Sequence, residues 1–350
     1  MSEPYLKGHG GKVFLASELT GRSPLELLDF SSNINCFFDL KKVKEILLEN
    51  IDLIAFYPDL NRAKRSLSNF LNVPKENLFL GNGSAELIFL TLWVLKPKKV
   101  LLPVPAFSEY ERASIGVGAQ IKFLVLEEEN DFHIPEEKLF NSLKEVDLLI
   151  LCNPNNPTGN ILNEEILKEC ARISKGWLLI DEAFLEFVSF EKRPSLIEEI
   201  FKNKVILLRS LTKVLSIPGI RVGYLIGPSS FIEKLKELVP PWGINVMAQI
   251  LFEHLETLYS LFLEGFGEFL KEKESFQKEL SQFLKVFPSY ANFFMFKCSK
   301  EDLFQRLLEK GFLIRDLREL KGLGPGFYRV CVRRSEDNKK LIEALKEVLG

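Results

Sequence analysis

The sequence has little of what marks several large classes of protein. Its five cysteines are odd in number, lie far apart and form no CxxC pair, so neither a disulfide framework nor a structural zinc site is expected. The three histidines are too scattered along the chain to suggest a metal cluster. We therefore expect no metal ion, and a reducing, cytoplasmic environment suits the free thiols best.

A strong excess of charge and long apolar runs are also missing. The net charge is −2 and the pI is about 6.1, so no broad field favours nucleic acid or an anionic membrane. No apolar run approaches the ~20 residues of a membrane span, and the first nine residues contain no apolar signal core. We expect a cytoplasmic protein without nucleic-acid or membrane partners, whose anion recognition is local.

Short apolar runs alternate with helical patterns between residues 75 and 230. The runs are 100–103, 121–126, 148–152, 177–181, 205–209 and 222–227. This alternation predicts an α/β fold with a mainly parallel sheet. Ligands bind such sheets at the carboxyl ends of the strands, where Asn153, Asp181 and Ser210 would meet.

The sequence pattern changes after residue 240, where short apolar runs give way to a longer helical pattern. A long helical region is expected over residues 245–284, followed by a small α+β domain with strands near 291–297 and 327–332. We therefore divide the 350 residues into an N-terminal segment (1–40) that packs with the small domain, a large domain (41–240), and a C-terminal part (241–350) with the long helix and the small domain.

One loop, Ser-Leu-Thr-Lys-Val-Leu-Ser-Ile-Pro-Gly-Ile-Arg over residues 210–221, carries a lysine and an arginine eight residues apart. Lys213 could form an imine if a partly desolvated site lowered its pKa, and Arg221 could anchor a phosphate. Pyridoxal 5'-phosphate offers both an aldehyde and a phosphate. A solvated basic loop is the alternative when this segment is considered alone.

Three further segments suit the same cofactor. Asp181 follows an apolar strand and could keep a pyridine nitrogen protonated, although many strand-end aspartates are structural. Asn156, in the string Asn-Pro-Asn-Asn-Pro-Thr-Gly, could donate its amide to the phenolate oxygen, although an Asn-Pro pair often marks only a turn. Phe107 could stack on the ring or simply belong to the core.

A phosphate site is predicted at the start of a helix. The string Gly-Asn-Gly-Ser-Ala-Glu precedes an apolar helical pattern, so the backbone N–H groups near Gly83, Ser84 and Ala85 could receive a phosphate. Ser210 and Arg221 would complete this cup.

Taken together, these strings resemble the fold type I, pyridoxal-phosphate-dependent aminotransferase superfamily, in its histidinol-phosphate aminotransferase-like branch. The resemblance rests on Asn-Pro-Asn-Asn-Pro-Thr-Gly, Asp-Glu-Ala-Phe, Ser-Leu-Thr-Lys and Gly-Ile-Arg in this order, and it implies the fold type I architecture. It implies that Lys213 bonds the cofactor, that Asp181 and Asn156 hold the ring, and that Ser84, Ala85, Ser210 and Arg221 bind the phosphate. Tyr57 resembles the tyrosine that reaches the cofactor phosphate of a neighbouring subunit, which implies a homodimer with shared sites.

Within the superfamily the chain is most similar to the threonine-phosphate decarboxylases of cobalamin biosynthesis, on strings near residues 8–11, 29–35, 107–112, 242–249 and 322–333. This similarity implies decarboxylation of L-threonine O-3-phosphate, with transamination of histidinol phosphate or another amino acid as the alternative. Phe184 departs from the tyrosine that many aminotransferases have there. The implied substrate residues are Arg329 for the carboxylate and His9, Gly10, Asn33, Arg315 and Arg333 around the phosphate.

Other interpretations of the two flanking arginines and of the whole chain remain. Arg315 and Arg333 could form surface salt bridges with Asp316 or Glu336 instead. A binding module without catalysis is disfavoured because the lysine, aspartate and arginine of the cofactor site are all present. A nicotinamide site is disfavoured because the glycine-rich turn lacks its third glycine.

Overall fold

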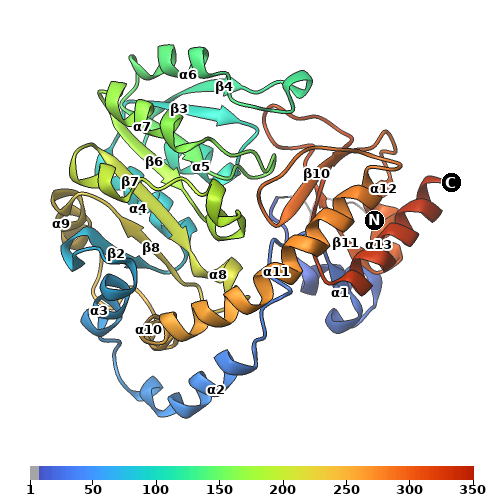
Figure 1. Ribbon diagram of the computed structural model, residues 1–350, viewed down its shortest axis with the longest axis horizontal. Coiled ribbons are helices and arrows are strands. Elements are labelled where there is room, and N and C mark those ends of the chain that lie inside the picture. The colour runs from blue at the N-terminus through green and yellow to red at the C-terminus, as the bar shows by residue number, and fades with distance from the viewer. Residues whose placement is uncertain (1–7) are drawn as a thin grey trace.

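A computed structural model describes residues 8–350 and is built around a seven-stranded sheet (Figure 1). Its strands are β2 (Leu78–Gly81), β3 (Lys99–Val104), β4 (Gln120–Val125), β5 (Leu148–Cys152), β6 (Trp177–Asp181), β7 (Val205–Ser210) and β8 (Gly223–Ile226). They lie in the order β2-β8-β7-β6-β5-β3-β4. Strands β7, β6, β5, β3 and β4 pair in parallel, whereas β8 is antiparallel to both of its neighbours.

All six apolar runs predicted as strands are strands of this sheet, so the expected mainly parallel α/β architecture is confirmed. The run Leu148–Cys152 is buried along its whole length, as expected for a strand covered on both faces. The seventh strand, β2, was not among the predicted runs because it is only four residues long and ends in the glycine of the Gly-Asn-Gly string.

Helices cover both faces of this sheet. On one face, α4 (Ser84–Leu95), α5 (Ser108–Gly116) and α9 (Ser229–Leu238) enclose one hydrophobic cluster with Leu148 and Ile150. On the other face, residues of α3 (Leu60–Leu71), α6 (Glu136–Leu143) and α7 (Glu164–Ile173) belong to one hydrophobic cluster with Leu149 and Leu151. Alternate side chains of one strand therefore serve opposite faces, which follows from the two-residue period of a strand.

A smaller unit lies at the other end of the molecule (Figure 1). Its antiparallel sheet has the order β12-β13-β10-β9, formed by Arg315–Asp316, Phe327–Cys331, Phe293–Lys297 and Lys285–Val286. The helices α12 (Leu303–Glu309) and α13 (Ser335–Leu349) pack together in this unit. The N-terminal segment joins it, because β1 (Leu28–Asp29) pairs in parallel with β11 (Phe312–Leu313) after α1 (Val13–Thr20).

The helical region expected over residues 245–284 is two helices rather than one. Helix α10 (Val246–Glu253) ends at His254, whose backbone leaves the helical conformation, and α11 (Leu255–Leu280) begins there. The break changes the chain direction, so α10 packs on α3 and on α2 (Lys41–Glu49), whereas α11 runs on to α13. Helix α11 thereby connects the two units (Figure 1).

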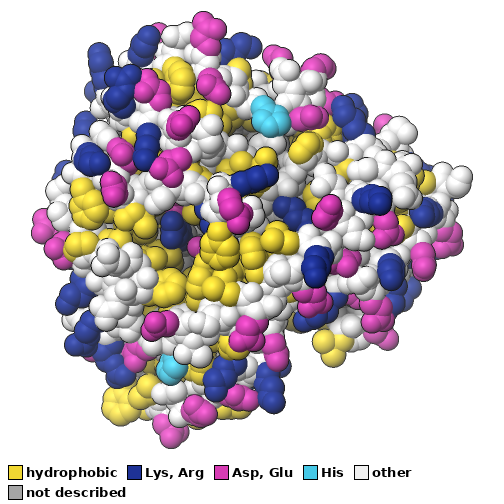
Figure 2. Space-filling view, in the orientation of Figure 1, with side chains coloured by type: hydrophobic (Ala, Val, Ile, Leu, Met, Phe, Trp, Pro, Cys, Tyr) yellow, Lys and Arg dark blue, Asp and Glu magenta, His cyan; other side chains and the backbone are white. Residues whose placement is uncertain are grey.

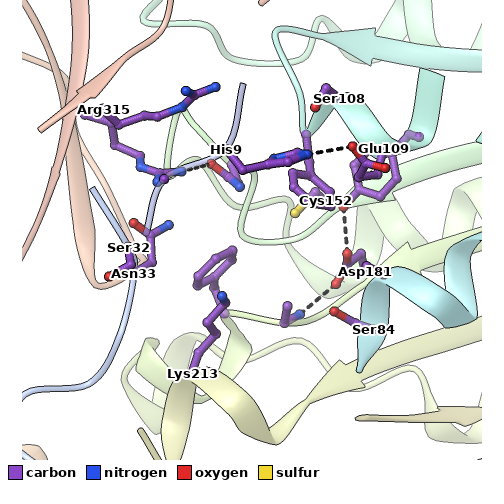
Figure 3. Close-up of a pocket in the computed structure, with 18 of the residues that line it drawn as sticks. His9, Ser32, Asn33, Ser84, Ser108, Glu109, Cys152, Asp181, Lys213 and Arg315 are labelled. Carbon is purple, nitrogen blue, oxygen red and sulfur yellow. Dashed lines mark hydrogen bonds and ion pairs between the residues drawn. The ribbon is translucent and has the colours of Figure 1, made fainter. Parts of the chain in front are cut away.

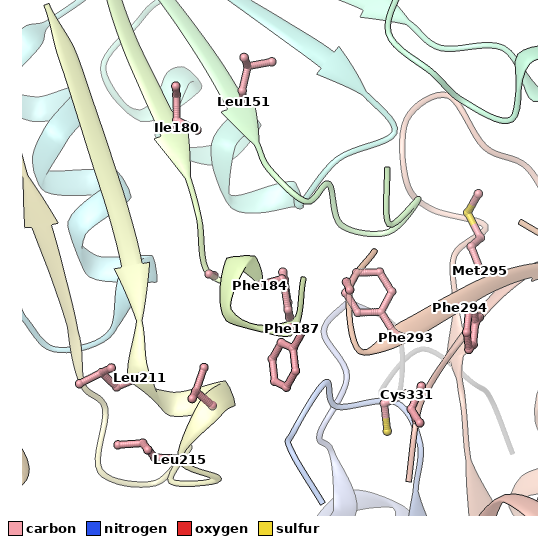
Figure 4. Close-up of a cluster of buried hydrophobic side chains, with 14 of the residues drawn as sticks. Leu151, Ile180, Phe184, Phe187, Leu211, Leu215, Phe293, Phe294, Met295 and Cys331 are labelled. Carbon is pink, nitrogen blue, oxygen red and sulfur yellow. The ribbon is translucent and has the colours of Figure 1, made fainter. Parts of the chain in front are cut away.

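One continuous hydrophobic cluster joins the two units (Figure 4). Phe184 and Phe187 follow β6 and lie on the side facing the small unit. Phe184 packs edge-on against Phe293 of β10, with ring centroids 5.0 Å apart. Phe184 therefore belongs to the contact between the two units, and it also lines the cavity described below.

Within residues 8–350, no helix combines the length and apolar character needed to cross a bilayer. The same residues contain no group of three or more histidine, cysteine or acidic side chains that could hold a metal ion. Acidic and basic side chains are interspersed over the face in Figure 2, and apolar side chains gather near its centre.

Candidate active site

A cavity of about 500 Å³ lies at the carboxyl ends of β5, β6 and β7, between the sheet and the small unit (Figure 3). It brings together most of the predicted site residues. Those that line it are His9, Gly10, Asn33, Ser84, Ala85, Phe107, Asn156, Asp181, Lys213, Arg221, Arg315 and Arg329. Segments separated by up to 320 residues therefore meet at the strand ends, as the sequence predicted.

Lys213 reaches the cavity from α8 (Leu211–Val214), a single helical turn directly after β7. Desolvation is the main cause that lowers its pKa to about 8, and the positive charges of Arg329 and Arg221 lower it further. A sizeable fraction of this amine is therefore unprotonated near neutral pH, which a nucleophilic lysine requires.

Asp181 ends β6 and is almost fully buried. Its carboxylate accepts hydrogen bonds from the Tyr110 hydroxyl at 2.7 Å and from the Ala183 N–H at 2.9 Å. Burial raises the pKa of Asp181 to about 6, and the hydrogen bond from Tyr110 opposes this rise. Because a buried carboxylate gains most from a positive partner, this site favours a protonated ring nitrogen.

The role of Tyr110 was missed in the sequence. It lies on α5 one helical turn after Phe107, and the two rings pack edge-on at 5.6 Å. The spacing of the two aromatics in Phe-Ser-Glu-Tyr was a usable signal, since residues three apart on a helix share a face.

We expect Tyr110→Phe to weaken cofactor binding by roughly tenfold, because a hydrogen bond to a charged group contributes about 1.5–3 kcal/mol. Without this donor the pKa of Asp181 rises further, so fewer carboxylates are ionised at neutral pH. Equilibrium dialysis of pyridoxal phosphate at pH 6 and pH 8 measures the effect, which should be larger at pH 6. Tyr328→Phe is the matched control, since this buried hydroxyl donates to the Lys300 carbonyl instead. Equal affinity of Tyr110→Phe and the unaltered protein would contradict this role.

The residues predicted to bind a phosphate lie around the start of α4. Gly83 precedes the helix with φ of 87°, and a Cβ there would lie 2.4 Å from Nη2 of Arg221. Only glycine therefore lets Arg221 approach the helix, whose first turn has no side-chain cap. Ser210 lies beside the cavity and its hydroxyl hydrogen-bonds that of Thr212 at 2.7 Å. The free N–H groups and the guanidinium suit a phosphate.

Arg329 extends from β13 toward the same cavity. Its Nη1 donates to Oδ1 of Asn156 at 2.5 Å and its Nη2 to the Ser31 carbonyl at 2.6 Å, whereas its buried Nε has no partner among the described residues. The Asn156 Nδ2 group is left for another acceptor. Desolvation and the charge of Arg315 lower the pKa of Arg329, so an anion bound here would be strongly stabilised.

The wall opposite Lys213 carries most of the other predicted substrate residues (Figure 3). Arg315 is buried and has no carboxylate partner among residues 8–350, because Asp316 pairs with Arg318 instead. The salt bridge considered for Arg315 is therefore absent from the described part of the chain. Asn33 is also buried, and its Oδ1 lacks a partner there.

His9 and Gly10 enter the cavity from the N-terminal segment. The His9 Nε2 lies 2.7 Å from Oε1 of Glu109, a carboxylate that also accepts from Arg112. A Cβ at Gly10 would lie 2.2 Å from the Ser31 carbonyl oxygen, so this close approach requires glycine. Glu109 was not singled out in the sequence, because its two partners come from different segments.

Four predicted residues are not among those that line the cavity: Gly83 and Ser210 of the predicted phosphate site, Arg333 and Tyr57. Arg333 follows the end of β13, donates to Asp337 at 2.9 Å and to the Asp29 carbonyl at 3.1 Å, and lies over the Phe30 ring. The Arg333 side chain therefore contacts α13 and does not reach the predicted phosphate position. Its acidic partner is Asp337 rather than Glu336. Tyr57 is 75% exposed and stacks on Trp242 with ring centroids 4.3 Å apart.

These residues fit pyridoxal phosphate. One cavity holds groups that match three parts of the cofactor. The Lys213 amine, whose pKa is lowered, suits the aldehyde, and the buried Asp181 carboxylate suits the ring nitrogen. The uncapped start of α4, with Arg221 beside it, suits the phosphate. Five lysine or arginine side chains and two carboxylates line it, so the described walls carry an excess of positive charge. This excess exceeds what one phosphate neutralises, and it suits a second anionic ligand.

The chain belongs to the aminotransferase class I and II family, whose model matches residues 26–345. It is 34% identical to the threonine-phosphate decarboxylase of Salmonella typhimurium, over 97% of this chain and 96% of that protein. It is also 32% identical to histidinol-phosphate aminotransferase 2 of Archaeoglobus fulgidus, over 92% of this chain and 93% of that protein. The crystal structure of the histidinol-phosphate aminotransferase from Clostridium acetobutylicum superposes with a TM-score of 0.85, at 31% identity, over 92% of this chain and 99% of that one.

Proposed function

We propose that the protein is a pyridoxal-phosphate-dependent carboxy-lyase that decarboxylates L-threonine O-3-phosphate to (R)-1-amino-2-propanol O-2-phosphate, a step of cobalamin biosynthesis. The observation that carries the proposal is the pair of buried arginines, Arg315 and Arg329, neither of which has a carboxylate partner among the described residues. A substrate with both a carboxylate and a phosphate would neutralise both. The similarity to the Salmonella decarboxylase over nearly the whole chain supports the same substrate.

Each residue of the cavity has its own role in the proposed reaction. Bound pyridoxal phosphate supplies an aldehyde that condenses with amines and a ring that withdraws electrons from the bond broken at Cα. Lys213 moves protons at its Nζ, because its lowered pKa allows both protonation states near neutral pH. Asp181 holds a proton on the ring nitrogen, and Tyr110 holds Asp181 in place. Arg329 orients the substrate carboxylate, while Arg315, His9 and Asn33 surround the substrate phosphate.

Transamination of histidinol phosphate is the alternative, favoured by the similarity to the Archaeoglobus enzyme. It would use the same lysine, aspartate and phosphate cup. Histidinol phosphate has no carboxylate, so the buried Nε of Arg329 would keep no anionic partner in that complex. The 2-oxo acid of that reaction would bring a carboxylate only in the other half-reaction, so the cost in the histidinol phosphate complex favours the decarboxylase.

Parallel reactions separate the two activities. The purified, cofactor-loaded protein is incubated with L-threonine O-3-phosphate in one tube and with histidinol phosphate plus 2-oxoglutarate in another. Carbon dioxide from the first tube without glutamate from the second supports the proposal, and glutamate from the second tube alone overturns it.

A homodimer with shared active sites is part of this proposal. Tyr57 is exposed and does not line the cavity of its own chain, and large apolar side chains near it, including Phe56, Ile54 and Trp242, are exposed as well. Exposed apolar side chains grouped in this way suit an interface between two copies, and Tyr57 would then reach the phosphate cup of the partner.

Complementation tests the shared site. Tyr57→Ala and Lys213→Ala proteins are each expected to lose most activity. When they are mixed and allowed to exchange subunits, hybrid dimers should regain activity in one site, because one chain supplies a lysine and the other a tyrosine. Failure of mixed proteins to exceed the sum of the separate activities, with hybrid dimers verified by tag pull-down, would contradict sharing.

A further inference from the structure

A second hollow, of about 240 Å³, lies where three segments meet away from the active-site cavity. One wall follows β6, one belongs to α11, and one belongs to the turn between β9 and β10. Its lining residues are Phe187, Ser189, Lys192, Leu270, Lys273, Glu274, Gln277, Ser289 and Tyr290. None of these residues lines the active-site cavity.

Two lysines from different segments line this hollow. Lys192 is exposed and Lys273 is half-buried, and no carboxylate of residues 8–350 is among the groups that act on the Lys273 amine. The Lys192 amine lies over the Tyr290 ring, 5.4 Å from its centroid. Burial, and then the charge of Lys192, lower the pKa of Lys273 to about 7. Holding two cations together in this way costs free energy that a bound anion would offset.

The other polar groups of the hollow are mostly donors. Ser289 accepts from the Ala291 N–H at 3.2 Å, which leaves its hydroxyl proton to donate. Ser189, Gln277 and Tyr290 add further groups that can donate. Glu274 also lines the hollow, but it is exposed, so water can screen its charge. Two ammonium groups and several neutral donors therefore line the hollow, and this set of donors can bind an oxyanion.

We propose that this hollow is a binding site for a small divalent oxyanion of the phosphate class, bridged between Lys192 and Lys273. The site adjoins the loop that carries Asn156, since the Tyr290 N–H donates to the Gly159 carbonyl at 2.8 Å. A Cβ at Gly159 would lie 2.1 Å from the Ser289 hydroxyl oxygen, so this loop and the wall of the hollow are in close contact. A bound anion therefore ties α11 and the segment after β6 to the loop that contacts Arg329.

Site-resolved acetylation tests this proposal without relying on catalysis. The cofactor-loaded protein is treated with an N-hydroxysuccinimide acetate, which labels neutral amines, and the labelling rate of each lysine is read by peptide mass spectrometry. Inorganic phosphate is the probe, and sodium chloride of equal ionic strength is the control. Lys271, which is exposed on the same helix, is the internal standard.

Phosphate is expected to slow the labelling of Lys273 several-fold while leaving Lys271 unchanged, because a bound anion both covers the amine and favours its protonated form. The protection should disappear in Lys192→Met and persist in Lys271→Met. Labelling of Lys273 that is unaffected by phosphate, or protection that survives Lys192→Met, would overturn the site. Protection caused by phosphate in the active-site cavity would not depend on Lys192, so the Lys192→Met variant separates the two sites.

Discussion

Lys213→Ala is expected to abolish the imine absorbance of the bound cofactor and to lower kcat by at least about 10³-fold, because the same amine both holds the cofactor and moves protons. The side chain lies in a single turn after β7, and burial, together with the charges of Arg329 and Arg221, lowers its pKa to about 8. Its removal leaves the phosphate cup at the start of α4 intact, so the variant should still bind pyridoxal phosphate, but reversibly.

The measurement is an absorbance spectrum together with dialysis and an activity assay. Lys271→Ala is the matched control, because this exposed lysine lies on α11 outside the cavity. A Lys213→Ala protein that keeps both colour after dialysis and activity would show that another amine bonds the cofactor, and the central assignment would be wrong.

Asp181→Asn is expected to lower kcat by about 10²–10⁴-fold, the range typical for a group that controls a proton in the reaction. The amide has nearly the same shape as the carboxylate. Its single oxygen can still accept from the Ala183 N–H while its NH2 group faces the Tyr110 hydroxyl, but it carries no charge to hold a proton on the ring nitrogen. The loss should therefore fall on kcat more than on the fold.

The pH dependence of cofactor binding identifies this carboxylate. The pKa of Asp181 is raised to about 6 by burial, so in the unaltered protein cofactor affinity should fall as the pH drops through about 6 and the carboxylate becomes protonated. Asp181→Asn should lack this step, because it has no proton to gain. Titration of cofactor binding between pH 5 and pH 8 measures both proteins, and an identical step in both would assign it to another group.

The parts of the fold that depend on a local sequence pattern were predictable from the sequence. Six apolar runs became strands, Asp181 ends β6 and Lys213 follows β7, because a strand end in a parallel sheet determines where the next side chain lies. The cup at Gly83 was also predictable, since glycine before an uncapped helix is a local feature.

What the sequence did not reveal depends on contacts between distant segments. Arg315 and Arg333 were both predicted to lie around the substrate phosphate. Only Arg315 lines the cavity, because Arg333 pairs with Asp337 in the first turn of α13. The hydrogen bond from Tyr110 to Asp181 joins residues 71 positions apart. The break at His254 follows from the packing of α10 on α2 and α3, which no helical pattern encodes.

The most direct test of the account is to count turnovers on L-threonine O-3-phosphate in the absence of any 2-oxo acid. A decarboxylase regenerates its cofactor in every cycle, so carbon dioxide should accumulate far beyond one equivalent per protein chain, together with an equal amount of amino-alcohol phosphate. No carbon dioxide, with amino-group transfer that stops after one equivalent and resumes only when a 2-oxo acid is added, would contradict the account and establish an aminotransferase.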